Sequence, residues 1–142
     1  MRMRACTSIV AVMLWALVTL SCVGSESSSS ASAQTGKAGE MTVTFLSDPS
    51  PLKTGDNGVM VTVKQPDGTP LADGTVTAVF SMPAMPSMNM PAMRSDATLT
   101  PQGNGVYRGT SQLSMAGTWS VAVSVSRSGQ PLGTAQFSVV AK

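Results

Sequence analysis

The sequence predicts an all-β fold, an antiparallel β-sandwich of about seven short strands. Three observations predict it. Apolar and polar residues alternate with a period of two in five separate runs after residue 40, which is typical of half-buried strands. These runs are separated by turn residues such as Gln65-Pro66-Asp67-Gly68, in which proline fixes one backbone angle and glycine tolerates a positive φ. No helical period of 3.6 is present after the N-terminal apolar run. A partly closed barrel is the alternative arrangement.

Each strand is expected where one face collects the apolar side chains. In chain order these sets are Met41, Val43 and Phe45; Val59, Val61 and Val63; Val76, Ala78, Phe80 and Met82; Trp119, Val121, Val123 and Val125; and Ala135, Phe137, Val139 and Ala141. Weaker strands are predicted at 97–100 and 106–113, with further turns at 102–105 and 128–131. About 100 residues suffice for one modest core without a disulfide or a structural metal. The sequence therefore predicts a single domain over residues 40–142, with Trp119 and Tyr107 packed inside it.

The N-terminus has the layout of a secretory signal. Arg2 and Arg4 precede an apolar run at 9–20, as a basic n-region precedes the h-region of a signal peptide. Ser21-Cys22 ends this run where a bacterial lipoprotein signal would end, although Thr19 stands where such signals usually have leucine. We therefore predict a lipoprotein-type signal at 1–22, lipid attachment at Cys22, and a flexible Ser-rich linker at 23–39.

Two alternatives to lipid attachment remain open. Ala31-Ser32-Ala33 resembles an ordinary cleavage site that would release the protein. The apolar run could also stay uncleaved as an anchor, because about 18–20 apolar residues can just span a bilayer. All three alternatives place the domain outside the cytoplasm. The prediction is an extracytoplasmic, membrane-anchored protein of the periplasm or cell envelope.

The composition argues against several function classes. The chain has no histidine, and Cys6 and Cys22 both lie before the predicted domain. Removing Arg2 and Arg4 from the nine basic residues leaves seven, against seven acidic ones, so no basic surface for nucleic acid is expected. The sequence shows no paired carboxylates, and general acid–base catalysis needs a group that titrates near the working pH. We predict that the protein is not an enzyme.

One segment concentrates the soft side chains. Residues 81–93 read SMPAMPSMNMPAM and hold five of the eleven methionines. The prolines exclude a regular helix or strand and favour polyproline II, in which Met82, Met85 and Met88 would project along one edge. Further thioethers could converge on them, from Met90 and Met93 in the same segment and from Met115 in LSMAGTW.

Thioether sulfur is neutral and polarizable, and it selects Cu(I) over harder ions. The sequence thus predicts a soft-metal site, for Cu(I) or Ag(I), with the ligands Met82, Met85, Met88, Met90, Met93 and Met115. Packing of a loop over one end of the sandwich explains the same residues without a metal. A flexible methionine-rich surface also suits an adaptable protein partner.

The ordered motifs of the domain resemble those of the YtkA-like family, which is related to the FixH-like extracytoplasmic proteins. The resemblance covers about residues 41–140. It rests on Pro51-x-x-x-Gly55, Pro66-Asp67-Gly68-Thr69-Pro70, Met82-Pro83-Ala84-Met85, Gly105-Val106-Tyr107 and Met115-Ala116-Gly117-Thr118-Trp119. It implies an immunoglobulin-like sandwich, export or membrane tethering, and for some relatives a role in copper handling.

The chain departs from the family at one point. Members often carry a histidine soon after the M-P-x-M element, whereas methionines continue here. Only Met82 and Met85 match the family element. The sequence leaves two functions open: a copper-handling accessory protein whose partner is another copper-handling or envelope protein, or a structural interaction module of the cell envelope that binds no metal.

Overall fold

The computed structural model describes residues 32–142. The predicted signal at 1–22, the lipid attachment at Cys22 and the first part of the predicted linker lie outside the described residues. The strands in chain order are β1 (Gln34–Ala38), β2 (Met41–Asp48), β3 (Gly55–Lys64), β4 (Thr75–Met82), β5 (Met93–Gly103), β6 (Val106–Leu113), β7 (Gly117–Arg127) and β8 (Gln130–Ala141). One short 3-10 helix, η1 (Pro86–Met88), lies between β4 and β5. In the part of the chain that the structure describes, no helix is long and apolar enough to cross a membrane.

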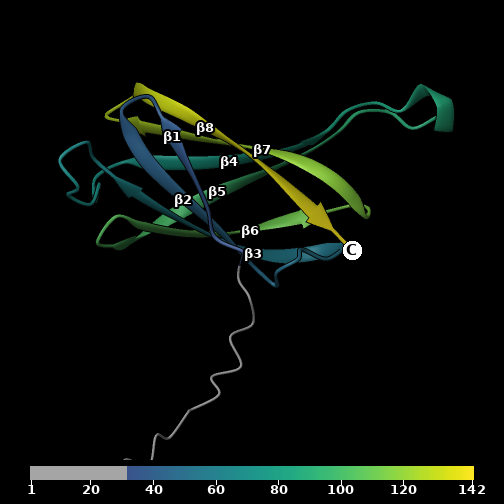
Figure 1. Ribbon diagram of the computed structural model, residues 1–142, viewed down its shortest axis with the longest axis horizontal. Coiled ribbons are helices and arrows are strands. Elements are labelled where there is room, and N and C mark those ends of the chain that lie inside the picture. The colour runs from purple at the N-terminus through teal and green to yellow at the C-terminus, as the bar shows by residue number, and fades with distance from the viewer. Residues whose placement is uncertain (1–31) are drawn as a thin grey trace, which may run out of the picture.

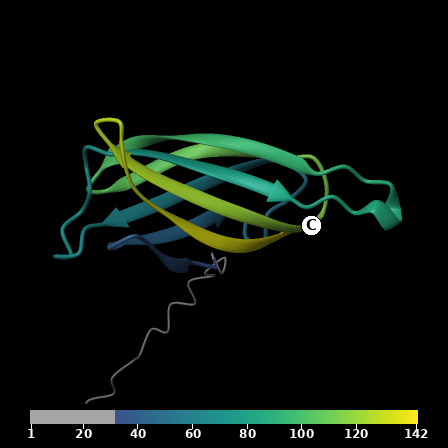
Figure 2. The same ribbon diagram turned by 90° about the horizontal axis from the view of Figure 1, so that it is seen from above.

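All strand pairs are antiparallel, in the order β1-β2-β3-β6-β5-β4-β7-β8. Strand β5 belongs to both layers, because residues 93–99 pair with β4 and residues 100–103 pair with β6. The register shifts between Pro101 and Gly103, where proline has no N–H to donate to a ladder. The predicted immunoglobulin-like antiparallel sandwich is confirmed, and it wraps far enough to bring its two outer strands together (Figure 2).

The outer strands β1 and β8 meet without a regular ladder. The side-chain amide of Gln34 donates to the carbonyl oxygen of Ser138 at 2.8 Å. A side chain at Gly36 would approach the ring of Phe137 at 3.0 Å, so the glycine lets β1 lie directly on β8. This contact closes the core on that side.

The core is formed by the predicted alternating faces. Phe45 lies between two other rings, with centroids 5.6 Å from Phe137 and 6.2 Å from Phe80. Trp119 and Tyr107 are buried, with 1% and 0% of their surfaces exposed, so both predictions of a packed role are confirmed. The Tyr107 hydroxyl donates to the carbonyl of Leu71 at 2.7 Å and accepts from the amide of Gly74 at 3.1 Å, which fixes the long connection between β3 and β4.

The predicted linker boundary at residue 39 is wrong. Residues 34–38, Gln-Thr-Gly-Lys-Ala, form strand β1 and pair with β2 from Gln34–Phe45 to Ala38–Met41. The sandwich therefore has eight strands where the sequence predicted about seven, and it starts before residue 40. The strand was missed because its inward side carries Gln34, Gly36 and Ala38, which leave no apolar alternation in the sequence.

The β4–β5 hairpin extends beyond the rest of the sandwich. Residues 83–92 project from the end of the molecule that also holds the β6–β7 loop and the end of β8 (Figures 1 and 2). This projecting part is the middle of the methionine-rich segment 81–93.

Candidate methionine site

The methionine segment is a hairpin. Met82 and Met93 stand opposite each other in the β4–β5 ladder. Met85 and Met90 then form an isolated bridge, in which each amide donates to the other's carbonyl at 3.0 and 3.1 Å. The predicted polyproline II arrangement is therefore wrong. The prolines interrupt the ladder, but the two arms pair again beyond them.

The tip of the hairpin closes through a turn of 3-10 helix. The amide of Met88 donates to Met85 at 3.0 Å and that of Asn89 donates to Pro86 at 3.1 Å. Asn89 adopts a left-handed conformation with φ of 52°, which asparagine tolerates better than most residues. The tip leaves Met88 with 59% of its surface exposed, so this sulfur lies away from the core.

Four methionines at or near the base of the hairpin pack into or against the core. Met82 is buried, with 3% of its surface exposed, and Met85, Met93 and Met115 are half-buried and packed against the core. They come from β4, the start of the tip, β5 and the β6–β7 loop. We call these four residues the methionine cluster.

The β6–β7 loop lies against the sulfur-bearing ends of this cluster. The hydroxyl of Ser114 donates to the sulfur of Met93 at 3.2 Å. A side chain at Gly117 would meet the methyl carbon of Met82 at 2.9 Å and its sulfur at 3.8 Å. Met115 lies between these two contacts in the chain, so its backbone lies close to Met82 and Met93.

A hydrogen bond from a buried side chain restrains the β6–β7 loop. The indole N–H of Trp119 donates to the carbonyl oxygen of Met115 at 3.1 Å. Because the ring is buried and inside a strand, this bond restrains the backbone of Met115 relative to β7. The half-buried thioether is thus carried by a fixed backbone.

The donor set is neutral. No residue between Met82 and Met93 is charged, and the neighbouring Arg94 pairs with Asp96 at 2.9 Å on the surface. Within residues 32–142, no group of three or more His, Cys, Asp or Glu side chains is placed to hold a metal ion. The chemistry available here is that of thioethers with one hydroxyl, and it fits a soft monovalent ion and not a hard divalent one.

The structure separates the six sequence-predicted ligands into two groups. Met82, Met85, Met93 and Met115 form the cluster, whereas Met88 and Met90 belong to the tip. Ser114 and Gly117 were missed. Both act through contacts that span more than twenty positions in the chain, and no local pattern marks such contacts.

The model of the family described as YtkA-like matches residues 35–124, which is well over half of the sequence. The chain belongs to the YtkA-like family. The match begins within β1, in agreement with a domain that starts before residue 40. Every member of the methionine cluster lies inside the matched range, so the candidate site is part of the YtkA-like domain itself.

Comparisons with curated proteins and with solved structures add no further family. Among proteins with curated descriptions, none matches this YtkA-like chain. A solved structure titled as the crystal structure of the Lin-41 filamin domain is similar to it, with 15% sequence identity and a TM-score of 0.48. That similarity covers 77% of this chain and 98% of the filamin domain.

Proposed function

We propose that this YtkA-like protein is a non-enzymatic, membrane-tethered, extracytoplasmic module that binds Cu(I) or Ag(I) through Met85, Met93 and Met115. The proposal rests on one observation. Three half-buried thioethers from separate parts of the chain pack against the core near the base of one hairpin, and the hydroxyl of Ser114, next to Met115 in the chain, donates to the sulfur of Met93. Met82 supports them from beneath as a core residue.

The chemistry of the cluster favours this ion class. When bound, a soft monovalent ion accepts electron density from neutral sulfur without requiring a negative protein charge. Half-burial leaves each of the three thioethers partly accessible, while the core behind them restricts their motion. Thioethers also cannot pair into disulfides, which suits an oxidising compartment.

The place where the N-terminal segment joins the sandwich supports a methionine site near the membrane. The amide of Ser32 donates to the hydroxyl of Ser50 at 3.1 Å. The same 49–54 connection bridges to β8 at Leu52–Ala141, and Ala141 pairs with Gly117 beside the cluster. Ser32, the first residue that the structure describes, therefore lies toward the end of the sandwich that carries the methionine cluster. A tether at Cys22, or an uncleaved anchor, would keep that end near the bilayer.

Competitive titration tests the metal proposal. The full-length chain in detergent, with Cys6 and Cys22 replaced by serine to remove thiol ligands, is titrated anaerobically with Cu(I) against a chromogenic chelator. We expect one ion per chain. Replacing Met85, Met93 and Met115 together by leucine conserves volume and is expected to lower the affinity at least about tenfold, which corresponds to about 1.4 kcal/mol.

The matched control is the pair Met41→Leu and Met60→Leu, because both residues lie on strands outside the cluster. This control is expected to bind like the parent. Equal Cu(I) affinity of the parent and the triple variant would refute the proposal. Equal loss in the control variant would show that methionine content, and not the cluster, governs binding.

A second function is favoured by the tip. Met88 is the most exposed large apolar residue among those the structure describes, and the projecting segment 83–92 carries no charge. Such a tip suits docking to an apolar groove of an envelope protein. A photocrosslinking residue at Met88 is expected to trap a partner that the same residue at exposed Thr118 does not trap. Identical crosslinking at both positions would refute this role.

A further inference from the structure

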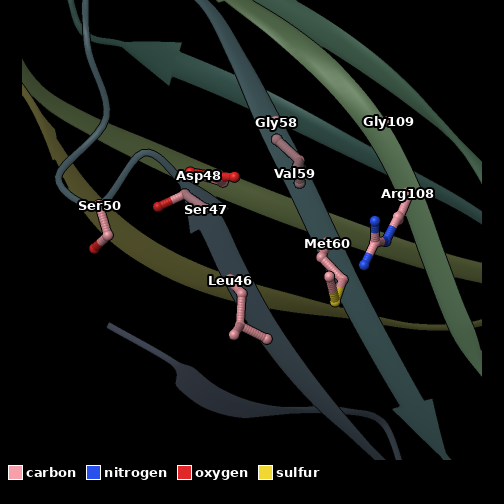
Figure 3. A pocket seen from close by; sticks show the side chains of 9 residues that line it. All are labelled: Leu46, Ser47, Asp48, Ser50, Gly58, Val59, Met60, Arg108 and Gly109. Atoms are coloured by element: carbon pink, nitrogen blue, oxygen red, sulfur yellow. The ribbon is translucent and has the colours of Figure 1, made fainter. Parts of the chain in front are cut away.

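The outer face of β2, β3 and β6 holds a shallow hollow of about 550 Å³ (Figure 3). Leu46 and Met60 supply an apolar floor, and Gly58 leaves it open because it has no side chain. Asp48 and Arg108 stand on its two sides. This face lies on a layer separate from the methionine cluster.

Strand register fixes the arrangement of these groups. Leu46, Met60 and Arg108 are paired side by side across three adjacent strands. Asp48 is opposite Gly58 in the next outward-facing row. The central strand β3 is therefore flanked by a carboxylate on β2 and a guanidinium on β6, with apolar surface between them.

Both charged groups are available for a partner. Asp48 and Arg108 are exposed. Within residues 32–142 the ion pairs are Arg94–Asp96 and Arg127–Asp73, and neither involves these two residues. Figure 3 shows Arg108 directed toward Met60, with Asp48 on the far side of β3.

We propose that this face binds a second copy of the chain, face to face, about a two-fold axis that runs along β3. Such an axis carries β2 of one copy over β6 of the other. Asp48 of each copy then meets Arg108 of its partner, and the two Met60 side chains meet at the axis. A two-fold interface requires this self-complementarity, in which the same two groups contact each other twice.

The charge arrangement favours a second copy over a small ligand. The two opposite charges lie on the strands at either side of the axis and are offset by one outward-facing row, about 7 Å along the strand. The long stem of Arg108 can span that offset. A second copy also covers Leu46 and Met60 together. The inference is independent of metal binding, because none of the four cluster residues lines this face.

Charge reversal tests the interface. The full-length chain is examined by sedimentation equilibrium in density-matched detergent over a range of protein concentration and salt. We expect a monomer–dimer equilibrium that weakens as salt rises. Asp48→Arg and Arg108→Asp are each expected to raise the dimer Kd by more than about tenfold, because like charges then face each other twice.

Complementation distinguishes this geometry from a simple loss of stability. The double variant is expected to dimerise like the parent, and so is an equimolar mixture of the two single variants, since each combination restores both charge pairs. Glu40→Arg, in the exposed β1–β2 turn at the other end of the sandwich, is the matched control and is expected to leave the Kd unchanged.

Three outcomes would overturn the proposal. The parent could remain monomeric at all concentrations. This result would overturn the proposal also if a small zwitterion binds the hollow in place of a second copy. The single reversals could leave the Kd unchanged, which would locate dimerisation elsewhere, such as the N-terminal segment. The mixture of single variants could also fail to associate although circular dichroism shows both folded.

Discussion

Replacing Tyr107 by phenylalanine removes one hydroxyl that joins two distant parts of the chain. The hydroxyl donates to the carbonyl of Leu71 at 2.7 Å and accepts from the amide of Gly74 at 3.1 Å. Leu71 is fully buried, so its carbonyl loses its hydroxyl partner without ready access to water, whereas the half-buried Gly74 can regain some hydration. An unsatisfied buried group costs about 1–3 kcal/mol. We expect the variant to lose about 2 kcal/mol of unfolding free energy.

The same hydroxyl makes stability depend on alkaline pH. Burial, and secondarily the negative charge of Asp73, raise the pKa of Tyr107 above its ordinary value of 10.0. The folded chain therefore keeps this proton at a pH where the unfolded chain has released it. The contribution is complete below the unfolded pKa and is lost as pH rises from about 10 through the folded pKa. Phenylalanine at this position removes that part of the alkaline loss.

Urea unfolding followed by far-UV circular dichroism at pH 7, and again near pH 11, measures both effects. The hydroxyl-deleting control is Thr118→Val, at an exposed position without a hydrogen bond from its side chain, and it is expected to change stability by less than about 0.5 kcal/mol. A Tyr107→Phe variant as stable as the control at pH 7, or with the same alkaline loss as the parent, would show that the two hydrogen bonds do not support the fold.

Three further changes have expected outcomes in the same unfolding assay. Met82→Ala should lower the free energy of unfolding by about 2–4 kcal/mol, because it leaves a cavity at a buried position. Met88→Ala at the exposed tip should lower it by less than about 0.5 kcal/mol. Equal effects of the two substitutions would contradict the burial of Met82. Gly117→Ala should lower the free energy of unfolding by about 1–2 kcal/mol, because φ of Gly117 is 142° and the added Cβ would lie 2.9 Å from the methyl carbon of Met82. A variant more stable than the parent would refute that contact. A double-mutant cycle on the ion pair of Asp73 and Arg127, whose charged atoms lie 2.6 Å apart, should give a coupling energy of less than about 1 kcal/mol that decreases as salt rises. A larger coupling energy that does not depend on salt would contradict the exposed position of the pair.

The strands were predictable because their signal is local. A strand that is half-buried must alternate apolar and polar residues, and β2, β3, β4, β7 and β8 each show that alternation. Strand β1 carries no such signal. Its inward positions are Gln34, Gly36 and Ala38. The close approach of β8 requires the small size of Gly36, and that requirement exists only once the sandwich has closed.

The candidate site was predictable in composition but not in arrangement. The prolines of the methionine segment do exclude a regular ladder over residues 83–92, as predicted. The predicted polyproline II conformation was wrong, because that geometry describes an isolated chain. Here the two arms of the hairpin are held together by the pairing of β4 with β5. Pairing across the hairpin outweighs the local preference.

The sequence by itself determined that this protein is a β-sandwich with soft, neutral sulfur concentrated near one loop, because alternation and composition are properties of neighbouring residues. Only the tertiary structure decided which methionines pack against the core near one another. The backbone of Met115 lies near Met82 and Met93 because β6 ends and β7 begins beside the base of the hairpin, and Met88 is excluded because the hairpin carries it outward. Such encounters depend on strand order and register across the whole sheet, and no short stretch of chain encodes them.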